Sequence, residues 1–178
     1  MTGRTMAVVI LDLQRKIRVD KDRLRRHSLW ALQSVRMSSC DLTLVLVNDR
    51  RMRSLNAAYR KKRGTTDVLS FEAGPPSPGQ PSRTARFLGE IVISLPRALV
   101  QANRFGIPAD DEITNLLIHG LCHLLGYDHE RGEQEAREMK QAEAKMARAI
   151  QKKEPALKTP SNISGKIPET FFGERIQD

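Results

Sequence analysis

The stretch ITNLLIHGLCHLLGYDH, residues 113–129, is apolar on nearly every side and carries three of the four histidines of this chain. A helix that is apolar all round is buried in its protein, so the stretch predicts a central helix. His119 and His123 are four residues apart, and side chains at that spacing share one helix face. Gly126 can end the helix in a left-handed conformation, and the chain can then bring His129 back over the first two histidines.

Three imidazoles brought together inside a protein suit a divalent metal ion. A buried polar group without a partner is costly, and one shared ion satisfies all three rings. Zinc bound by three protein nitrogens, with the fourth position open for water, is typical of catalytic sites, while nickel, copper and iron also accept imidazole. The sequence therefore predicts one metal site with His119, His123 and His129 as ligands. The alternative is two hydrogen-bonded core histidines followed by a surface histidine.

The same histidine spacing occurs in metzincin metalloproteases, which carry a glutamate directly after the first histidine as general base. Gly120 occupies that position here, and glycine has no side chain to accept a proton. Peptidase chemistry is therefore disfavoured, although Asp128 and Glu130 flank His129 and could accept a proton. A structural zinc site would be closed by a fourth protein ligand. Cys122 is a candidate for that ligand, although its simpler interpretation is a small core residue.

The other segments alternate between strand and helix patterns and end in helices only. Runs of β-branched and aliphatic residues predict four short strands, at residues 6–11, 41–47, 67–71 and 87–94. Apolar periodicity and capping residues predict five helices, at residues 20–37, 48–64, 96–106, 109–125 and 133–151. This order favours an α+β fold, in which a small mixed four-stranded sheet packs against helices and the metal-binding helix lies in the C-terminal half.

The chain has the length of a single domain. We expect residues 1–151 to form one catalytic metal-binding domain, and residues 152–178 to form a flexible C-terminal tail because they lack apolar periodicity. Residues 73–84, rich in Pro, Gly and Ser, predict a mobile loop. No apolar run reaches the length of a membrane span, and the two cysteines form no disulfide framework, so a cytoplasmic protein is expected.

Positive charge is concentrated in the first part of the chain. The net charge is +9, and residues 1–70 account for +10 while residues 71–178 carry −1. Seven basic residues follow one another without an intervening acid: Arg50, Arg51, Arg53, Arg60, Lys61, Lys62 and Arg63. Such a run is usually a solvated helix face. Without acidic neighbours it repels itself, and phosphate binding relieves that repulsion, so we interpret the run as an RNA-binding surface.

The basic helix also carries a stripe that is expected to face the core. Met52, Leu55, Asn56 and Tyr59 lie at helical spacing on one side. Arg60 directly follows this stripe and could reach a cleft. An arginine there could hold a phosphate through two hydrogen bonds and stabilise charge that develops on it.

Three segments resemble the YbeY family of rRNA maturation factors. Residues 119–129 resemble its histidine signature. The sequence LNAAYRKKRGTTDVLSF, residues 55–71, is similar to the family's Leu-Asn-x-x-Tyr-Arg block and the following Thr-Asp-Val-Leu-Ser-Phe, and LGEIVIS, residues 88–94, is similar to its Leu-Gly-Asp-Ile-Val-Ile strand. The resemblance covers roughly residues 40–150. The chain departs from the family at Glu90, where Asp is usual, and at Gly64, Thr65 and Glu72, where prolines are frequent.

The resemblance implies a zinc-dependent, single-strand-selective endoribonuclease, which is a hydrolase acting on phosphodiester bonds. It implies a role in ribosome biogenesis, in processing the 3′ end of small-subunit rRNA, with single-stranded rRNA and the small ribosomal subunit or its proteins as partners. The family's zinc ligands correspond to His119, His123 and His129, and its catalytic arginine corresponds to Arg60. The alternative is a non-catalytic ribosome-assembly factor with a structural zinc.

Overall fold

The computed structural model describes residues 6–74 and 87–156 of the 178-residue chain. The described strands are β1 (Val8–Asp12), β2 (Asp41–Val47), β3 (Val68–Glu72) and β4 (Phe87–Ser94). The described helices are α1 (Lys21–Ser34), α2 (Asp49–Arg60), α3 (Leu95–Phe105), α4 (Ala109–Leu124) and α5 (Glu133–Gln151). Most of the predicted mobile loop, residues 73–84, lies outside the described residues.

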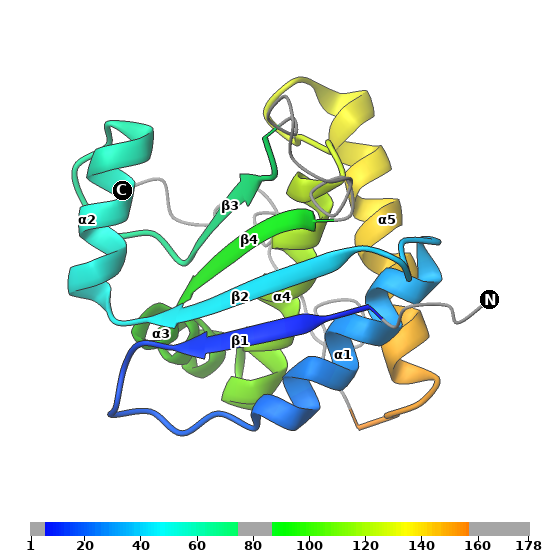
Figure 1. The fold of residues 1–178 in the computed structure, drawn as a ribbon, viewed down its shortest axis with the longest axis horizontal. Helices are drawn as coiled ribbons and strands as arrows, with labels where there is room; N and C mark the ends of the chain where they lie inside the picture. The colour runs from blue at the N-terminus through cyan, green and yellow to red at the C-terminus, as the bar shows by residue number, and fades with distance from the viewer. Residues whose placement is uncertain (1–5, 75–86, 157–178) are drawn as a thin grey trace, which may run out of the picture.

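The strands form one mixed sheet in the order β1-β2-β4-β3 (Figure 1). Strand β2 runs parallel to β1 and to β4, and β3 runs antiparallel to β4. In the centre of the sheet, Leu44 pairs with Ile10 on one side and Ile91 on the other. Ile91 in turn pairs with Ser70 at the β3 edge. With five helices described around this sheet, the predicted α+β class is confirmed.

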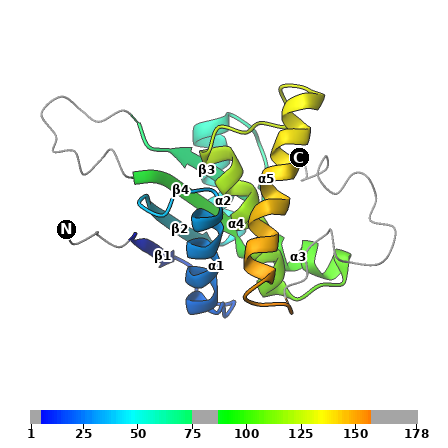
Figure 2. The ribbon, with the colours of Figure 1, turned by 90° about the vertical axis from the view of Figure 1, so that its right-hand side faces the viewer.

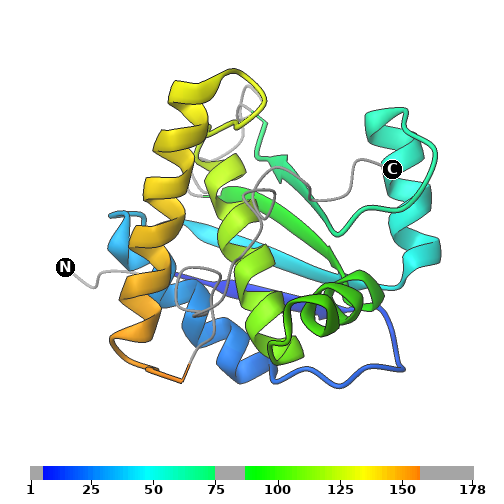
Figure 3. The ribbon, with the colours of Figure 1, turned by 180° about the vertical axis from the view of Figure 1, so that it is seen from behind.

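Helix α4 is the centre of the main core. It lies against β3 and β4, with α1 and α5 beside it on the same side of the sheet (Figures 2 and 3). Its side chains are buried almost throughout, as the apolar sequence predicts for a helix enclosed on all sides. The largest fully buried side chains of this core on the sheet and on α4 are Leu42, Leu44, Leu46, Ile91, Ile93, Ile113, Leu116, Leu117 and Leu121.

Helix α2 packs against the other face of the sheet. Successive strand residues point to opposite faces, and on β2 Leu46 belongs to the main core while Val45 and Val47 belong to a second, smaller core. Met52 of α2 fills that second core. Asn48 caps the helix as predicted, because its Oδ1 accepts a hydrogen bond from the Arg51 N–H at 2.9 Å.

The predicted end of this helix at Gly64 is wrong. The helix ends at Arg60, because Lys61 adopts a left-handed conformation with φ of 55°. Asn56 then holds the following segment, donating from Nδ2 to the Gly64 carbonyl at 3.3 Å. The prediction that Tyr59 faces the core is also wrong, since its side chain is 67% exposed.

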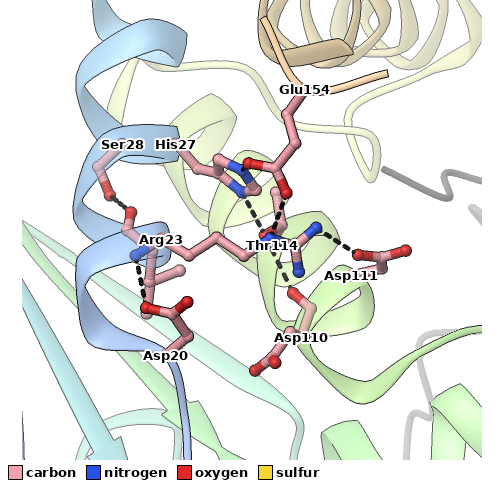
Figure 4. A network of polar contacts seen from close by, with 9 residues as sticks. Asp20, Arg23, His27, Ser28, Asp110, Asp111, Thr114 and Glu154 are labelled. Carbon is pink, nitrogen blue, oxygen red and sulfur yellow. Dashed lines mark hydrogen bonds and ion pairs between the residues drawn. The ribbon is translucent and has the colours of Figure 1, made fainter. Parts of the chain in front are cut away.

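A polar network ties α1 to α4 and to the residues after α5 (Figure 4). Arg23 of α1 forms ion pairs with Asp111 of α4, at 2.7 Å, and with Glu154. Glu154 also contacts Nε2 of the buried His27 at 2.9 Å, and Nδ1 of that ring lies 2.8 Å from the Thr114 hydroxyl. The network therefore joins three helical segments through one arginine and one histidine.

Glu154 lies within residues 152–178, for which a flexible tail is predicted. Its ion pairs attach the first residues of that segment to the domain, while residues 157–178 lie outside the described part of the chain. The division into one domain and a flexible tail therefore stays a prediction for the rest of the segment. Within the described residues, no helix combines the length and the apolar character needed to cross a membrane.

We predict that Glu154→Gln lowers the free energy of unfolding by about 1–2 kcal/mol at pH 7, because Arg23 and His27 lose a half-buried charged acceptor. Urea denaturation measures the change. The matched control is Glu133→Gln on α5, whose pair with Arg137 is solvent-exposed and contributes less than about 0.5 kcal/mol. Equal losses in the two variants would contradict a structural role for Glu154.

Wild type and Glu154→Gln also test how stability depends on pH. Burial raises the pKa of Glu154, but the hydrogen bonds from His27 and Arg23 outweigh it and hold the pKa below the usual 4.5. A carboxyl whose pKa is lowered by folding stabilises the protein above its unfolded pKa, and this stabilisation is lost as the pH falls through the folded pKa. The difference between wild type and Glu154→Gln should therefore be full at pH 7 and shrink below pH 4.5.

Candidate metal centre

The three predicted histidines come together at the C-terminal end of α4. His119 and His123 project from the same flank of the helix, and their ring centroids are 4.7 Å apart. The ring of His129 lies 5.6 Å from that of His119 and 5.5 Å from that of His123. One nitrogen from each ring lies within 4.8 Å of the other two, which is an arrangement that could hold a metal ion.

A glycine turn brings the third histidine into place. Gly126 has φ of 88°, in the left-handed region predicted from the sequence. Its N–H donates to the His123 carbonyl at 3.0 Å, and the Tyr127 N–H donates to the Cys122 carbonyl at 3.0 Å. These two bonds satisfy carbonyls at the end of α4 and reverse the chain direction, so that His129 returns over the helix end.

Glu143 of α5 fixes the orientation of the first histidine. Its Oε1 lies 2.8 Å from Nδ1 of His119, and both side chains are buried. A carboxylate is an acceptor, so His119 donates from Nδ1 and presents Nε2 to the cluster. Carboxylates that accept from the second nitrogen of a metal-ligating histidine hold the ring in one tautomer and make it a more basic ligand.

The distance between the first two ligand atoms suits a tetrahedral ion. Nε2 of His119 and Nε2 of His123 are 3.2 Å apart. Two nitrogens bound to one tetrahedral zinc at about 2.0–2.1 Å are separated by about 3.3 Å. The rings therefore stand where a shared ion would place them.

The surroundings keep His123 ready to bind a cation. Burial lowers the pKa of His123, and electrostatic interactions with His129 and Arg60 lower it further, against the opposing effects of Asp128 and Glu143. A lowered pKa favours the neutral imidazole, which is the form that binds metal. Arg60 and His123 line one common hollow.

A hollow of about 440 Å³ opens in front of the histidines. One wall comes from the end of α2 with Tyr59 and Arg60, and the opposite wall comes from the turn that carries Asp128 and Arg131. Strand β3 lines the hollow between them. Asp128 stays ionised, because the hydrogen bond from the Glu130 N–H lowers its pKa. The hollow therefore combines the nitrogen cluster with charged groups of both signs.

The cluster has no fourth protein ligand among the described residues. The ligand atoms that come together belong to His119, His123 and His129 alone. Cys122 is fully buried in the main core, in agreement with its interpretation as a small core residue. A site of three histidines beside a hollow leaves the fourth position of a tetrahedral ion accessible, as in catalytic zinc sites.

The basic residues of the predicted RNA surface take different positions. Arg60 and Lys62 line the hollow beside the histidines. The remaining members of the set are exposed but do not line it: Arg50, Arg51, Arg53, Lys61 and Arg63. The structure therefore brings Arg60 to the cluster and leaves most of the charge on the outer surface of α2 and the segment that follows it.

Gly120 lies on the face of α4 that touches the sheet. A Cβ atom at this position would meet Cγ2 of Ile91 at 2.7 Å and the Ser70 hydroxyl at 3.2 Å. The same hydroxyl donates to the Gly120 carbonyl at 3.1 Å. There is no room for the glutamate that follows the first histidine in metzincins, and this position faces the sheet instead of the hollow.

Three residues of the site could not be recognised from the histidine pattern. Glu143 lies between Met139 and Met146 on the buried face of α5, and a carboxylate in an apolar stripe is a usable sign of a buried partner. Arg131 gave no sign, because it is one of many arginines in the chain. Tyr59 was assigned to the core because its spacing fits the stripe of α2.

We predict that Gly120→Ala destabilises the protein despite the higher helix propensity of alanine. The added methyl group overpacks a buried contact, which costs about 1–3 kcal/mol, whereas alanine gains roughly 1 kcal/mol over glycine in a helix. Gly74→Ala is the control, since a Cβ there would meet nothing within 4 Å. Urea denaturation should show a lower free energy of unfolding for Gly120→Ala and no decrease for Gly74→Ala. A stabilised Gly120→Ala protein would refute the close contact.

We predict that the histidines and Glu143 contribute unequally to metal affinity. His123→Ala removes a ligand and should leave the purified protein with little bound metal. Glu143→Gln keeps the shape but weakens the acceptor, and should reduce affinity by about 10–100-fold. Metal analysis and competition with a chromophoric chelator measure both. If Glu143→Gln binds metal as tightly as wild type while His123→Ala is depleted of metal, Glu143 has only a packing role.

The sequence and the fold were compared with known proteins. The profile of the family described as Endoribonuclease YbeY matches residues 10–151. The curated protein named Endoribonuclease YbeY from Aquifex aeolicus is 34% identical over 153 residues, covering 84% of this chain and 98% of its own. The protein of the same name from Persephonella marina is 44% identical over 108 residues, covering 61% of this chain and 69% of its own.

A solved structure shows the same fold. The solution structure of a Thermotoga maritima protein superposes with a TM-score of 0.55 at 21% identity, covering 87% of this chain and 98% of that one. At that identity the likeness concerns the fold alone. The family profile includes the histidine cluster and Arg60, the Aquifex aeolicus relative covers 84% of the chain, and on that evidence the chain belongs to the YbeY family.

Proposed function

We propose that this chain is a zinc-dependent, single-strand-selective endoribonuclease that acts in ribosome biogenesis, on the 3′ end of small-subunit rRNA. The observation that carries the proposal is the cluster of three histidines beside a hollow that Arg60 also lines. The family profile described as Endoribonuclease YbeY covers this part of the chain, and the relatives of that name support RNA as the substrate.

Zinc is proposed from the chemistry of the donor set. Three clustered imidazole nitrogens suit zinc, and the 3.2 Å separation of the first two nitrogens fits its bond lengths. When bound, the ion would lower the pKa of a water molecule toward neutrality or polarise a phosphoryl oxygen. His119, His123 and His129 would hold it, and Glu143 would keep His119 oriented.

Arg60 is proposed to act on the scissile phosphate. Its planar guanidinium can donate two parallel hydrogen bonds to phosphate oxygens. Because it lines the hollow together with the histidines, it can stabilise negative charge on the non-bridging phosphate oxygens in the transition state. Lys62 lines the same hollow, and the exposed arginines of α2 are proposed to hold the RNA backbone outside it.

The accessible fourth position argues against the alternative of an assembly factor with a structural zinc. Structural zinc sites are closed by four protein ligands, and within the described residues the cluster supplies three. The proposed partner is a single-stranded region of rRNA on the small ribosomal subunit. The exposed basic residues of α2 support a polyanionic partner.

The direct test is cleavage of a single-stranded RNA by the purified protein, with zinc, with a chelator, and with zinc restored after chelation. We expect cleavage that the chelator abolishes and zinc restores. His123→Ala serves as the control for a contaminating nuclease. An intact protein that binds zinc and RNA but leaves every single-stranded substrate uncleaved would support the assembly-factor alternative.

We predict that Arg60 and Arg63 differ in what they contribute. Arg60→Ala should lower the cleavage rate by more than it weakens RNA binding, because a contact made chiefly with the transition state appears in turnover. Arg63→Ala removes the same side chain from outside the hollow. It should weaken binding of all sequences alike and reduce the salt dependence of affinity by about one counterion.

Binding constants and single-turnover rates on one RNA at fixed salt make this comparison. Arg60→Lys should restore little activity, since a lysine lacks the planar fork. If Arg60→Ala and Arg63→Ala change both measurements by the same factors, then Arg60 belongs to the general electrostatic surface and has no special role at the phosphate.

A further inference from the structure

Tyr59 is an aromatic side chain in an unexpected place. It lies in the last turn of α2, directly before Arg60, and its side chain is 67% exposed. The other large apolar side chains exposed among the described residues are aliphatic: Val9, Leu11, Leu13 and Val100. Burying a tyrosine ring is favourable, so an exposed ring beside the histidine cluster is suited to contact a ligand.

The ring is held in place from one side. Phe71 of β3 lies against it, with ring centroids 4.9 Å apart and an interplanar angle of 68°. Phe71 is itself partly buried and packs on the second core with Met52 and Leu69. An edge-to-face contact of this kind stabilises a ring pair. It anchors one side of Tyr59 while most of the ring surface stays open.

Both rings line the same hollow as the histidine cluster, Arg60 and Lys62. Sites for single-stranded nucleic acid combine cations that follow the backbone with aromatic faces on which bases stack. Tyr59 and Arg60 are consecutive residues at the end of α2, and both line this hollow together with Lys62 and Phe71. A negatively charged peptide would use the cations but would leave the aromatic surface without a partner.

We propose that Tyr59, supported by Phe71, is a stacking platform for one unpaired nucleobase next to the phosphate at the histidine cluster. The proposal rests on the proposed ribonuclease function and names the feature of the substrate that the site recognises. A base within a duplex is stacked on both faces and cannot present one to Tyr59. The platform therefore selects single strands, and it tolerates any base because every base has a π face.

Three variants of the full chain separate stacking from packing. Tyr59→Phe keeps the aromatic face, Tyr59→Leu keeps apolar cover for Phe71 without that face, and Tyr59→Ala removes both. We expect Tyr59→Leu and Tyr59→Ala to bind a short single-stranded RNA about tenfold more weakly, and Tyr59→Phe to bind within roughly twofold of wild type. Val100→Ala on α3, away from the hollow, is the control and should bind as wild type does.

A scan of the RNA tests whether one base is held. Bases are replaced one at a time by an abasic ribose, and binding is measured by fluorescence anisotropy with the chelator-treated chain. One position should weaken wild-type binding by about the same factor as Tyr59→Leu and have no further effect in Tyr59→Leu, because the two changes remove the same contact. In the zinc-loaded chain, Tyr59→Leu should raise KM and leave kcat nearly unchanged, because stacking contributes to substrate binding.

The outcomes separate this proposal from the function on which it rests. If the chain cleaves RNA and Tyr59→Leu matches Tyr59→Phe, the ring only covers Phe71 and the platform is refuted, while the ribonuclease stands. If the chain binds RNA through Tyr59 but cleaves none, the ribonuclease is refuted and the platform stands. If no abasic position couples to Tyr59, or if the chain binds no RNA, the platform is refuted.

Discussion

The close contact between α4 and the sheet at Gly120 is the constraint on which the site depends. Because no side chain separates the helix from Ile91 and Ser70, the helix axis is drawn against β3 and β4. The flank that carries His119 and His123 then lines the hollow. A larger residue at this position would lift the helix and move both histidines relative to β3, which also lines the hollow.

Buried charge is matched at each end of α4. At the N-terminal end Asp111 pairs with Arg23, which also binds Glu154. At the C-terminal end Glu143 accepts from His119 and thereby directs the opposite ring nitrogen at the cluster. An acceptor left unpaired in this core would be costly, so the two contacts stabilise the helix. The second of them also sets the geometry of the cluster, which links stability to the candidate function.

The sequence predicts the elements that periodicity and capping define, and the histidine site within them. The apolar segment around His119 predicts a buried helix, and Gly126 predicts the turn that returns His129; the structure contains both. Local patterns fail where tertiary contacts decide. The helix that starts after Asn48 ends at Arg60 because Lys61 adopts a left-handed conformation. A lysine in the sequence does not predict that conformation. The pairing of Glu143 with His119 joins positions 24 residues apart, and no local pattern reports it.

Tyr59 shows how the failure of a pattern can carry information. Its spacing on α2 matches the buried Met52, so periodicity assigns both to the core. The second core, however, is small and ends near Leu55 and Phe71, so the helix extends beyond the surface that it covers. The last turn of α2 therefore lies at the hollow, and its Tyr59 and Arg60 both line it. An aromatic face without a core beneath it is available to a ligand, and the adjacent guanidinium favours one that carries a phosphate.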